Sequence, residues 1–351
     1  MAKDISKIDR NLAVAGIDVP DCVFHDIRKP PFKIYGLYKP ETENTFRRLP
    51  EDVALATSKA VFDLHANTAG GRVRFKTDSE YVAISVKMDD IGKMPHFAFT
   101  GSIGFDLYAD NVYEKTFVPP VDITDGYESI VEFADKKIRE VTINFPLYTE
   151  VCELYIGLDE NSVIEPADEY EIQKPVVYYG SSITQGGCAS RPGNSYQSIV
   201  SRKLNCDYIN LGFSGSAKGE DEIADYIKNL DMSAFVYDYD HNAPTLEHLE
   251  KTHERMFKII RTANPDLPII FMTRPKLYLC EEEQARFRLI LSNYEKAVAN
   301  GDENVYFISG KDLMAGTDND GTVDNSHPND LGFKAMAVKV GAVLKDILKG
   351  E

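Results

Sequence analysis

The stretch YYGSSITQGG, residues 178–187, decides how the C-terminal half of the chain is built. It begins inside PVVYY (175–179), a series of β-branched and aromatic residues typical of a buried strand. This strand stops at a glycine that is followed by two serines and a threonine. Turns favour these residues, but a serine after a strand of an open α/β sheet also lies where such sheets bind ligands. The rest of the chain decides between the two interpretations.

Short apolar segments alternate with helical segments from about residue 173 onward. The predicted strands are 175–180, 207–212, 234–240, 268–273 and 304–309, and the predicted helices lie near 194–204, 220–230, 245–263, 281–299 and 329–349. This alternation is typical of right-handed crossovers onto a parallel sheet. We therefore predict a three-layer α/β/α domain with a parallel five-stranded sheet over residues 173–351.

Residues 1–170 follow a different pattern. Segments of roughly alternating polarity lie at 72–88, 104–118, 140–148 and 152–158, with little helical periodicity between them. Each of the first two contains a turn signal, which predicts a hairpin. We predict an N-terminal β-sandwich domain of the jelly-roll kind. The first 45 residues are expected to form an arm on its surface, and the acidic stretch 165–175 is expected to link the two domains.

Composition excludes several kinds of partner. The 351 residues carry a formal net charge of −17, which repels nucleic-acid phosphates and anionic lipid headgroups. We find no apolar run of about 18 residues that could cross a membrane, and we expect no signal peptide at the start of the chain. The five cysteines are scattered and never in CxxC spacing, so we expect reduced thiols and a cytoplasmic location.

The loops after the predicted strands carry side chains suited to acyl transfer. Ser182 follows the first strand, Gly215 the second and Asn242 the third. Asp324 and His327 lie just before the last helix. A serine hydroxyl attacks an ester well when a base removes its proton, and a carboxylate best orients that base. We therefore predict Ser182 as the nucleophile, His327 as the base and Asp324 as the orienting acid.

The negative charge that develops on the attacked carbonyl oxygen needs hydrogen-bond donors. The predicted oxyanion hole consists of the main-chain N–H groups of Ser182 and Gly215 and the side-chain amide of Asn242. A glycine lets the backbone approach the substrate closely, and an asparagine amide donates without bringing a charge. This chemistry requires no cofactor. The seven histidines are dispersed, with no HxH or HExxH pattern, so no metal site is expected.

These blocks, taken in order, resemble the SGNH/GDSL hydrolases. GSSIT (180–184) stands where that family carries its Gly-Asp-Ser-Leu block, and NLGFSG (210–215), Asn242 and DNSH (324–327) match the other three. GFDLY (104–108) resembles the GxDLY signature of the β-domain that precedes some of these esterases. The resemblance covers most of the chain and implies an esterase with the site residues named above.

Two positions depart from the family pattern. Ser181 replaces the usual aspartate of the first block, and Ala243 rather than aspartate follows Asn242. Neither aspartate is needed for the acyl transfer described above. The resemblance implies removal of small acyl groups, most of all acetyl, from a carbohydrate or similar polar alcohol. Two alternatives stay open: an acyltransferase that uses the same acyl-enzyme, and a carbohydrate-binding protein with a vestigial triad.

Three further residues have two interpretations each, and Cys188 has one. His241 can contact the substrate or support the site from behind. His96 can contact the substrate or lie in the domain interface. Arg274 can bind an anionic substrate group or form a salt bridge within the acidic shell. Cys188 is expected to line a loop or pocket wall, because no histidine–carboxylate pair is assigned to it. The expected partner is a small-molecule or oligosaccharide acyl ester, and a homo-oligomer is left open.

Overall fold

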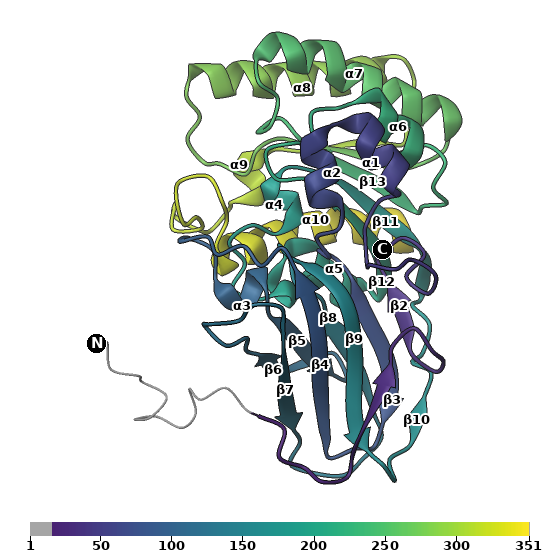
Figure 1. Cartoon of the computed structure of the whole chain (residues 1–351). Helices are drawn as coiled ribbons and strands as arrows, with labels where there is room; N and C mark the ends of the chain where they lie inside the picture. Colours follow the sequence, from purple (N-terminus) through teal and green to yellow (C-terminus); the bar gives the residue numbers. More distant parts are fainter. Residues whose placement is uncertain (1–15, 351) are drawn as a thin grey trace, which may run out of the picture.

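The computed structural model of the protein describes residues 16–350. Two antiparallel sheets occupy one end of the molecule, and a parallel sheet flanked by helices occupies the other (Figure 1). This arrangement confirms the predicted fold class of an α/β domain preceded by antiparallel sheets. Among the described residues, no helix combines the length and the apolar character needed to span a bilayer.

The parallel sheet has the strand order β12-β11-β13-β14-β15. Its strands are β11 (Ile172–Gly180), β12 (Cys206–Gly212), β13 (Ala234–Asp238), β14 (Ile269–Met272) and β15 (Val305–Ile308). Every residue of β13 and β14 is buried, which explains why these strands are continuous apolar runs. Because β12 and β13 flank β11 on opposite sides, the strand order reverses at β11 and leaves a crevice at its carboxyl end.

Helices cover both faces of this sheet. On one face lie α6 (Asp221–Ile227), α7 (Leu246–Ala263) and α8 (Glu281–Ala299), and on the other lie α5 (Tyr196–Leu204) and α10 (Asp330–Lys349). Two single-turn helices, α4 (Ser182–Gln185) and α9 (Gly310–Leu313), follow strands β11 and β15. The other five helices lie where helices were predicted, each between two strands of the parallel sheet or after the last one.

The N-terminal half folds into two antiparallel sheets. One has the order β1-β9-β4-β7 and the other β10-β3-β8-β5-β6, with β2 paired to β3. The strands are β1 (Cys22–Asp26), β2 (Lys33–Tyr35), β3 (Arg72–Thr77), β4 (Tyr81–Asp89), β5 (Phe105–Ala109), β6 (Val112–Phe117), β7 (Gly126–Glu132), β8 (Arg139–Asn144), β9 (Glu150–Asp159) and β10 (Ile164–Glu165). A short helix, α3 (Phe99–Ser102), precedes β5.

The two predicted hairpins have different outcomes. β5 and β6 pair antiparallel around Asp110 and Asn111, whose positive φ angles of 51° and 64° suit a tight hairpin turn. The hairpin predicted over 72–88 is wrong, because β3 and β4 belong to different sheets. Both strands turn apolar side chains toward one shared core, so their polarity pattern is the same as that of a hairpin. The predicted surface arm also supplies β1 and β2 to the sheets.

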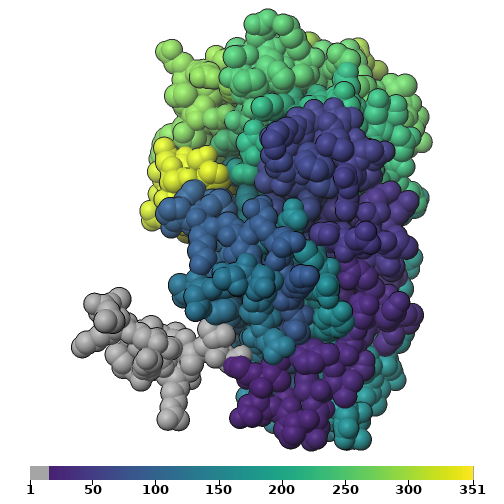
Figure 2. All heavy atoms as spheres, in the orientation of Figure 1, coloured from purple at the N-terminus to yellow at the C-terminus, as the bar shows by residue number. Residues whose placement is uncertain are grey.

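Two short helices of the N-terminal half pack against the C-terminal half. They are α1 (Glu51–Thr57) and α2 (Lys59–His65), and no helix was predicted there. Leu49, Ala54 and Val61 are fully buried in the same apolar core as Val177 and Leu211 of the parallel sheet. Figure 2 shows this dark blue segment set among the green atoms of the C-terminal half. The packing therefore crosses the predicted boundary between 170 and 173 at this place.

Arg48, just before α1, fixes this segment to the parallel sheet. Its side chain is buried, and its Nε donates to Asn67 O at 2.6 Å. Nη1 donates to the carbonyls of Gly212 and Asn210 at 2.6 and 3.2 Å, and Nη2 donates to Leu64 O at 2.8 Å. Burial lowers the pKa of Arg48 to about 9, so the guanidinium stays charged at neutral pH. Carbonyl dipoles replace the water that would otherwise solvate this charge.

Replacing Arg48 by leucine should destabilise the protein strongly. The change leaves several buried carbonyls without donors, and each unpaired carbonyl costs about 1–3 kcal/mol. We therefore expect the free energy of unfolding, measured with urea, to fall by about 3–5 kcal/mol. The matched control is Arg255→Leu, which removes only an exposed ion pair with Asp221 and should cost less than about 1 kcal/mol. Equal losses in the two variants would contradict the role given to Arg48.

Candidate active site

Ser182 lies at the start of α4, directly after the carboxyl end of β11. Ser181 caps this helix with its side chain, and its main-chain N–H donates to Asp238 O of β13 at 3.2 Å. On the other side β12 passes close to the turn, since a Cβ at Gly212 would lie 2.1 Å from the nitrogen of Gln185. Only glycine permits this approach. The two neighbouring strands thus hold Ser182 in place, with 9% of its surface exposed.

Ser182, His327 and Asp324 form a chain of hydrogen bonds. Ser182 Oγ lies 2.9 Å from His327 Nε2, and His327 Nδ1 lies 2.7 Å from Asp324 Oδ2. Burial raises the pKa of Asp324, but the hydrogen bonds from the main chain and ring of His327 outweigh it, so this pKa lies below its usual value. The ionised carboxylate favours a proton on Nδ1, which leaves Nε2 to accept from the serine hydroxyl.

The local backbone explains the three-residue spacing of Asp324 and His327. Asp324 Oδ1 accepts the main-chain N–H groups of Ser326 and His327 at 3.1 and 2.7 Å, so the carboxylate closes its own turn. Asn325 lies inside this turn with a φ of 66°, a conformation that asparagine tolerates better than most residues. Val323 N–H also donates to His327 O at 2.9 Å. The acid and the imidazole are thereby fixed to each other before any contact with Ser182.

The three predicted oxyanion donors follow the ends of three neighbouring strands, β11, β12 and β13. Gly215, after β12, has a φ of 66°, and open space lies where a Cβ would be. Asn242, after β13, donates one amide hydrogen to Phe213 O at 3.0 Å, which leaves the other hydrogen of its NH2 group. The N–H of Ser182 is the first in α4, where no preceding turn accepts it. These are the groups predicted as the oxyanion hole.

The N-terminal half closes one side of the site. Tyr148 donates its hydroxyl to Ser182 O at 3.2 Å, and its ring centre lies 4.8 Å from that of Phe97. Phe97 in turn lies 6.0 Å from the ring of His327. His96 is half exposed, with its Nε2 4.0 Å from Asp324 Oδ2 and its ring 5.9 Å from that of His327. His96 therefore lies both at the domain interface and at the edge of the site.

His241 and Arg274 lie in the loops that follow strands β13 and β14. His241 Nε2 is buried without a hydrogen-bond partner. Burial, followed by the positive charges of Arg274 and His327, lowers the pKa of His241 to about 3, so its ring is neutral. Arg274 Nη1 lies 2.9 Å from Glu283 and its Nε 3.4 Å from Asp240. The salt-bridge interpretation therefore describes the position of Arg274, while the substrate-binding interpretation stays a prediction.

Cys188 forms part of the wall near the triad. Its thiol is buried and its backbone is left-handed, with a φ of 71°. Burial and then the negative charge of Asp324 raise the pKa of Cys188 to about 12, so the thiol stays protonated. Within residues 16–350, ligand atoms of His96, Cys188 and His327 lie within 4.8 Å of one another. An ion held there would compete with the hydrogen bonds of His327.

Sequence reasoning named none of the residue pairs that join the site to the N-terminal half. Asp106 of the GFDLY motif is fully buried and accepts from Arg191 Nη1 at 2.9 Å. Gln185 Nε2 donates to Leu147 O at 3.1 Å, and its Oε1 accepts the N–H of Ser214 at 3.0 Å. The GFDLY match was the only sequence signal for these contacts. Partners 85 positions apart, as Asp106 and Arg191 are, form no local pattern.

Comparison with known proteins agrees with this geometry. The model of the GDSL-like lipase/acylhydrolase family matches residues 173–345, and that of the GxDLY N-terminus of SGNH-hydrolase-type esterases matches residues 22–164. The chain belongs to the SGNH/GDSL hydrolases. This confirms the resemblance seen in the sequence, in both halves of this hydrolase. A comparison with curated proteins found no match.

Three solved structures illustrate the likeness. A GDSL-like lipase, so described, from Bacteroides ovatus ATCC 8483 is 28% identical with a TM-score of 0.84, over 93% of this chain and 98% of that one. A salicylyl-acyltransferase from a tetracycline biosynthetic pathway is 17% identical with a TM-score of 0.76, over 94% and 99%. An acetyl xylan esterase from the rumen bacterium Butyrivibrio proteoclasticus is 13% identical with a TM-score of 0.60, over 93% and 99%. The last two likenesses show the fold alone.

Alkylation of the cysteines should follow burial and thiol pKa. Iodoacetamide reacts with the thiolate, so the exposed Cys280 should be modified first in the folded protein at pH 7.5, and Cys188 should resist. Peptide mapping by mass spectrometry measures both in one sample. Unfolding in urea is the control and should make the two thiols react at similar rates. Rapid modification of Cys188 in the folded state would instead identify an exposed thiolate beside the triad.

Proposed function

We propose that this hydrolase is a serine esterase that removes small acyl groups, most of all acetyl, from a carbohydrate or similar polar alcohol. The observation that carries the proposal is the chain from Ser182 Oγ to His327 Nε2 at 2.9 Å and from His327 Nδ1 to Asp324 at 2.7 Å. This geometry suits a nucleophile, its general base and the group that orients the base. Family membership and the fold likeness to an acetyl xylan esterase support the reaction class.

The proposed reaction proceeds through an acyl-enzyme. His327 Nε2 takes the proton of Ser182 as Oγ attacks the ester carbonyl carbon, and the donors near Ser182, Gly215 and Asn242 stabilise the oxyanion. The tetrahedral intermediate collapses when His327 returns the proton to the departing alcohol oxygen. Water then attacks the acyl-enzyme with His327 as base, which releases the acid and restores Ser182. Asp324 stays ionised throughout and stabilises the imidazolium.

The preference for a small acyl group rests on what surrounds Ser182. Tyr148 contacts the serine carbonyl directly, and Phe97 packs between Tyr148 and His327. These rings occupy the side of the site on which the N-terminal half lies. A short acyl group needs little space beside these rings, whereas a longer one that extended toward this side would meet packed aromatic side chains.

Substitutions at adjacent serines test the nucleophile. Ser182→Ala should lower kcat for 4-nitrophenyl acetate by roughly 10⁴-fold or more, because no other hydroxyl in the described part of the chain is bonded to the His327 ring. Ser181→Ala is the matched control, since it removes a helix cap worth about 1 kcal/mol of stability but should keep most of the activity. Circular dichroism checks that both variants fold. If Ser181→Ala lost activity and Ser182→Ala kept it, the nucleophile would be Ser181 and not Ser182.

Asp324→Asn tests whether the acid is engaged. Since the carboxylate accepts both from the ring and from the main chain of His327, the substitution should reduce kcat/KM by roughly 10⁴-fold through loss of charge and of the correct tautomer. His327→Ala should be as inactive as Ser182→Ala. A loss of only about tenfold in Asp324→Asn would show that His327 and Ser182 work as a dyad, with Asp324 contributing mainly to the loop.

A series of ester substrates tests the acyl preference and the nature of the acceptor. We expect kcat/KM to fall steeply from 4-nitrophenyl acetate to the octanoate, and acetylated sugars to release acetate. A preference for octanoate would reject the small-acyl proposal. The second candidate, acyl transfer to another alcohol, draws on the fold likeness to a salicylyl-acyltransferase. Transfer products that exceed hydrolysis when sugars or phenols are added would favour it, and an inert Ser182 would favour a binding protein.

We also propose a reducing, cytoplasmic setting for this activity. All five cysteines are free thiols, including Cys22 and Cys152, which are only partly buried. The net charge of −17 makes an uncharged polar ester a better partner than a nucleic acid or an anionic membrane surface. The proposed ligand is a small molecule or an oligosaccharide.

A further inference from the structure

A hollow of about 450 Å³ lies where the N-terminal sheets meet the helices of the hydrolase domain. Tyr108 of β5 and Asn111 of the β5–β6 turn form one side of it. Helices α5 and α10 and the loop before α5 form the other, with Arg191, Arg202, Lys203 and Lys334 among the lining residues. We call these four side chains the basic cluster. It stands out on a chain whose net charge is −17.

Most of the charge in the basic cluster has no carboxylate partner. Arg191 alone forms an ion pair, with Asp106 at 2.9 Å. Within residues 16–350, no carboxylate lies within 4.0 Å of the charged nitrogens of Arg202, Lys203 or Lys334. Burial lowers the pKa of Lys203, and the positive charges of Lys334 and Arg202 lower it further. Like charges that face one hollow repel each other, so an anion bound between them would be stabilised.

The two arginines are held in fixed positions. Arg191 donates to Asp106 and to the hydroxyl of Tyr108, and Arg202 Nη2 donates to Gly193 O at 2.7 Å. The guanidinium of Arg202 also lies 4.1 Å from the ring centre of Tyr108. Its Nη1 is buried without a hydrogen-bond partner. Because these side chains are already ordered, a ligand would meet little entropic cost in using them.

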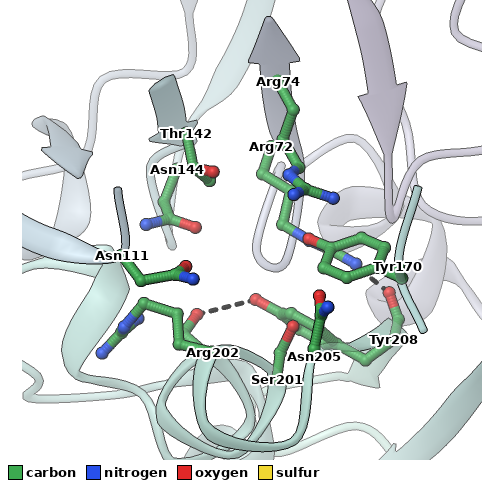
Figure 3. A pocket seen from close by; sticks show the side chains of 11 residues that line it. Arg72, Arg74, Asn111, Thr142, Asn144, Tyr170, Ser201, Arg202, Asn205 and Tyr208 are labelled. Atoms are coloured by element: carbon green, nitrogen blue, oxygen red, sulfur yellow. Dashed lines mark hydrogen bonds between the residues drawn. The ribbon is translucent and has the colours of Figure 1, made fainter. Parts of the chain in front are cut away.

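A second, inner hollow shares Asn111 and Arg202 with the first (Figure 3). Arg72 and Arg74 lie across it from Arg202, whose side chain extends away from them beneath Asn111. Arg74 Nη1 is also buried without a partner. The inner hollow has room of about 10 Å³, enough for one water molecule. A water there can bond the Arg74 nitrogen, whereas any larger anion belongs in the outer hollow.

We propose that the outer hollow binds a phosphate group, as free phosphate or as a small phosphate monoester. The basic cluster supplies four positive charges. Two carboxylates offset them: Asp106, which is paired with Arg191, and Asp330, which is bonded to Ser190. The two charges that remain match a dianion better than a carboxylate, and phosphate monoesters carry about −1.5 to −2 at pH 7. Lys203 and Lys334 contribute mobile donors, and the arginines contribute fixed positive charge. This proposal does not depend on the proposed esterase reaction.

Isothermal titration calorimetry with inorganic phosphate tests the proposal on the full chain. We expect saturable one-to-one binding that sulfate displaces and acetate does not. The double variant Lys203→Gln/Lys334→Gln should bind phosphate at least about tenfold more weakly, because it removes both unpaired ammonium groups from the hollow. The matched control is Lys311→Gln, an exposed lysine on α9 that lines neither hollow, and it should bind as the original chain does.

A parallel titration with glycerol 3-phosphate separates the two sources of the phosphate group. Tighter binding of the ester would identify a phosphorylated molecule, and equal or weaker binding would identify free phosphate. Thermal unfolding without ligand verifies that the double variant is folded, and its turnover of 4-nitrophenyl acetate should be unchanged. Absence of saturable phosphate binding, equal affinity in the double variant, or acetate binding as tight as phosphate would each overturn the proposal.

Discussion

The arrangement of the two halves depends on the buried guanidinium of Arg48. A charge in this position is unfavourable unless carbonyl dipoles surround it, and the carbonyls that do so come from both halves of the chain. One of them belongs to Gly212, at the end of β12. The strand end and the N-terminal segment therefore satisfy each other's hydrogen bonds, and removing one partner while the packing stays would leave polar groups buried and unpaired. The loop that carries Gly215 begins at this fixed point.

The same joining continues around the site. Gln185 connects the end of α4 to the N-terminal half through Leu147, and Asp106 holds the loop of Arg191. Tyr148 reaches the carbonyl of Ser182 itself. The N-terminal sheets thus act as one wall of the candidate active site, and they hold the helical turn that presents the serine. A module that merely delivered the hydrolase to its substrate would not need contacts of this kind.

The parallel sheet could be predicted from the sequence because its strands are buried on both faces and become continuous apolar runs. The candidate triad followed, since strand ends of one sheet meet at one edge and the family blocks lie at those ends. Periodicity could not show that β3 and β4 belong to different sheets, because two strands that face one core have the same polarity pattern as a hairpin. It also could not reveal α1 and α2, each seven residues long, whose stability comes from packing on a distant core.

The position of α1 and α2 affects how the protein can fold while it is being synthesised. Leu49 and Val61 leave the ribosome more than 100 residues before Val177 and Leu211, the core residues against which they pack. The N-terminal sheets can form during synthesis, as N-terminal domains generally do, but this segment must wait with its apolar side chains exposed. Chaperone contact during translation, if the chain requires it, is therefore expected between residues 46 and 66 rather than along the strands.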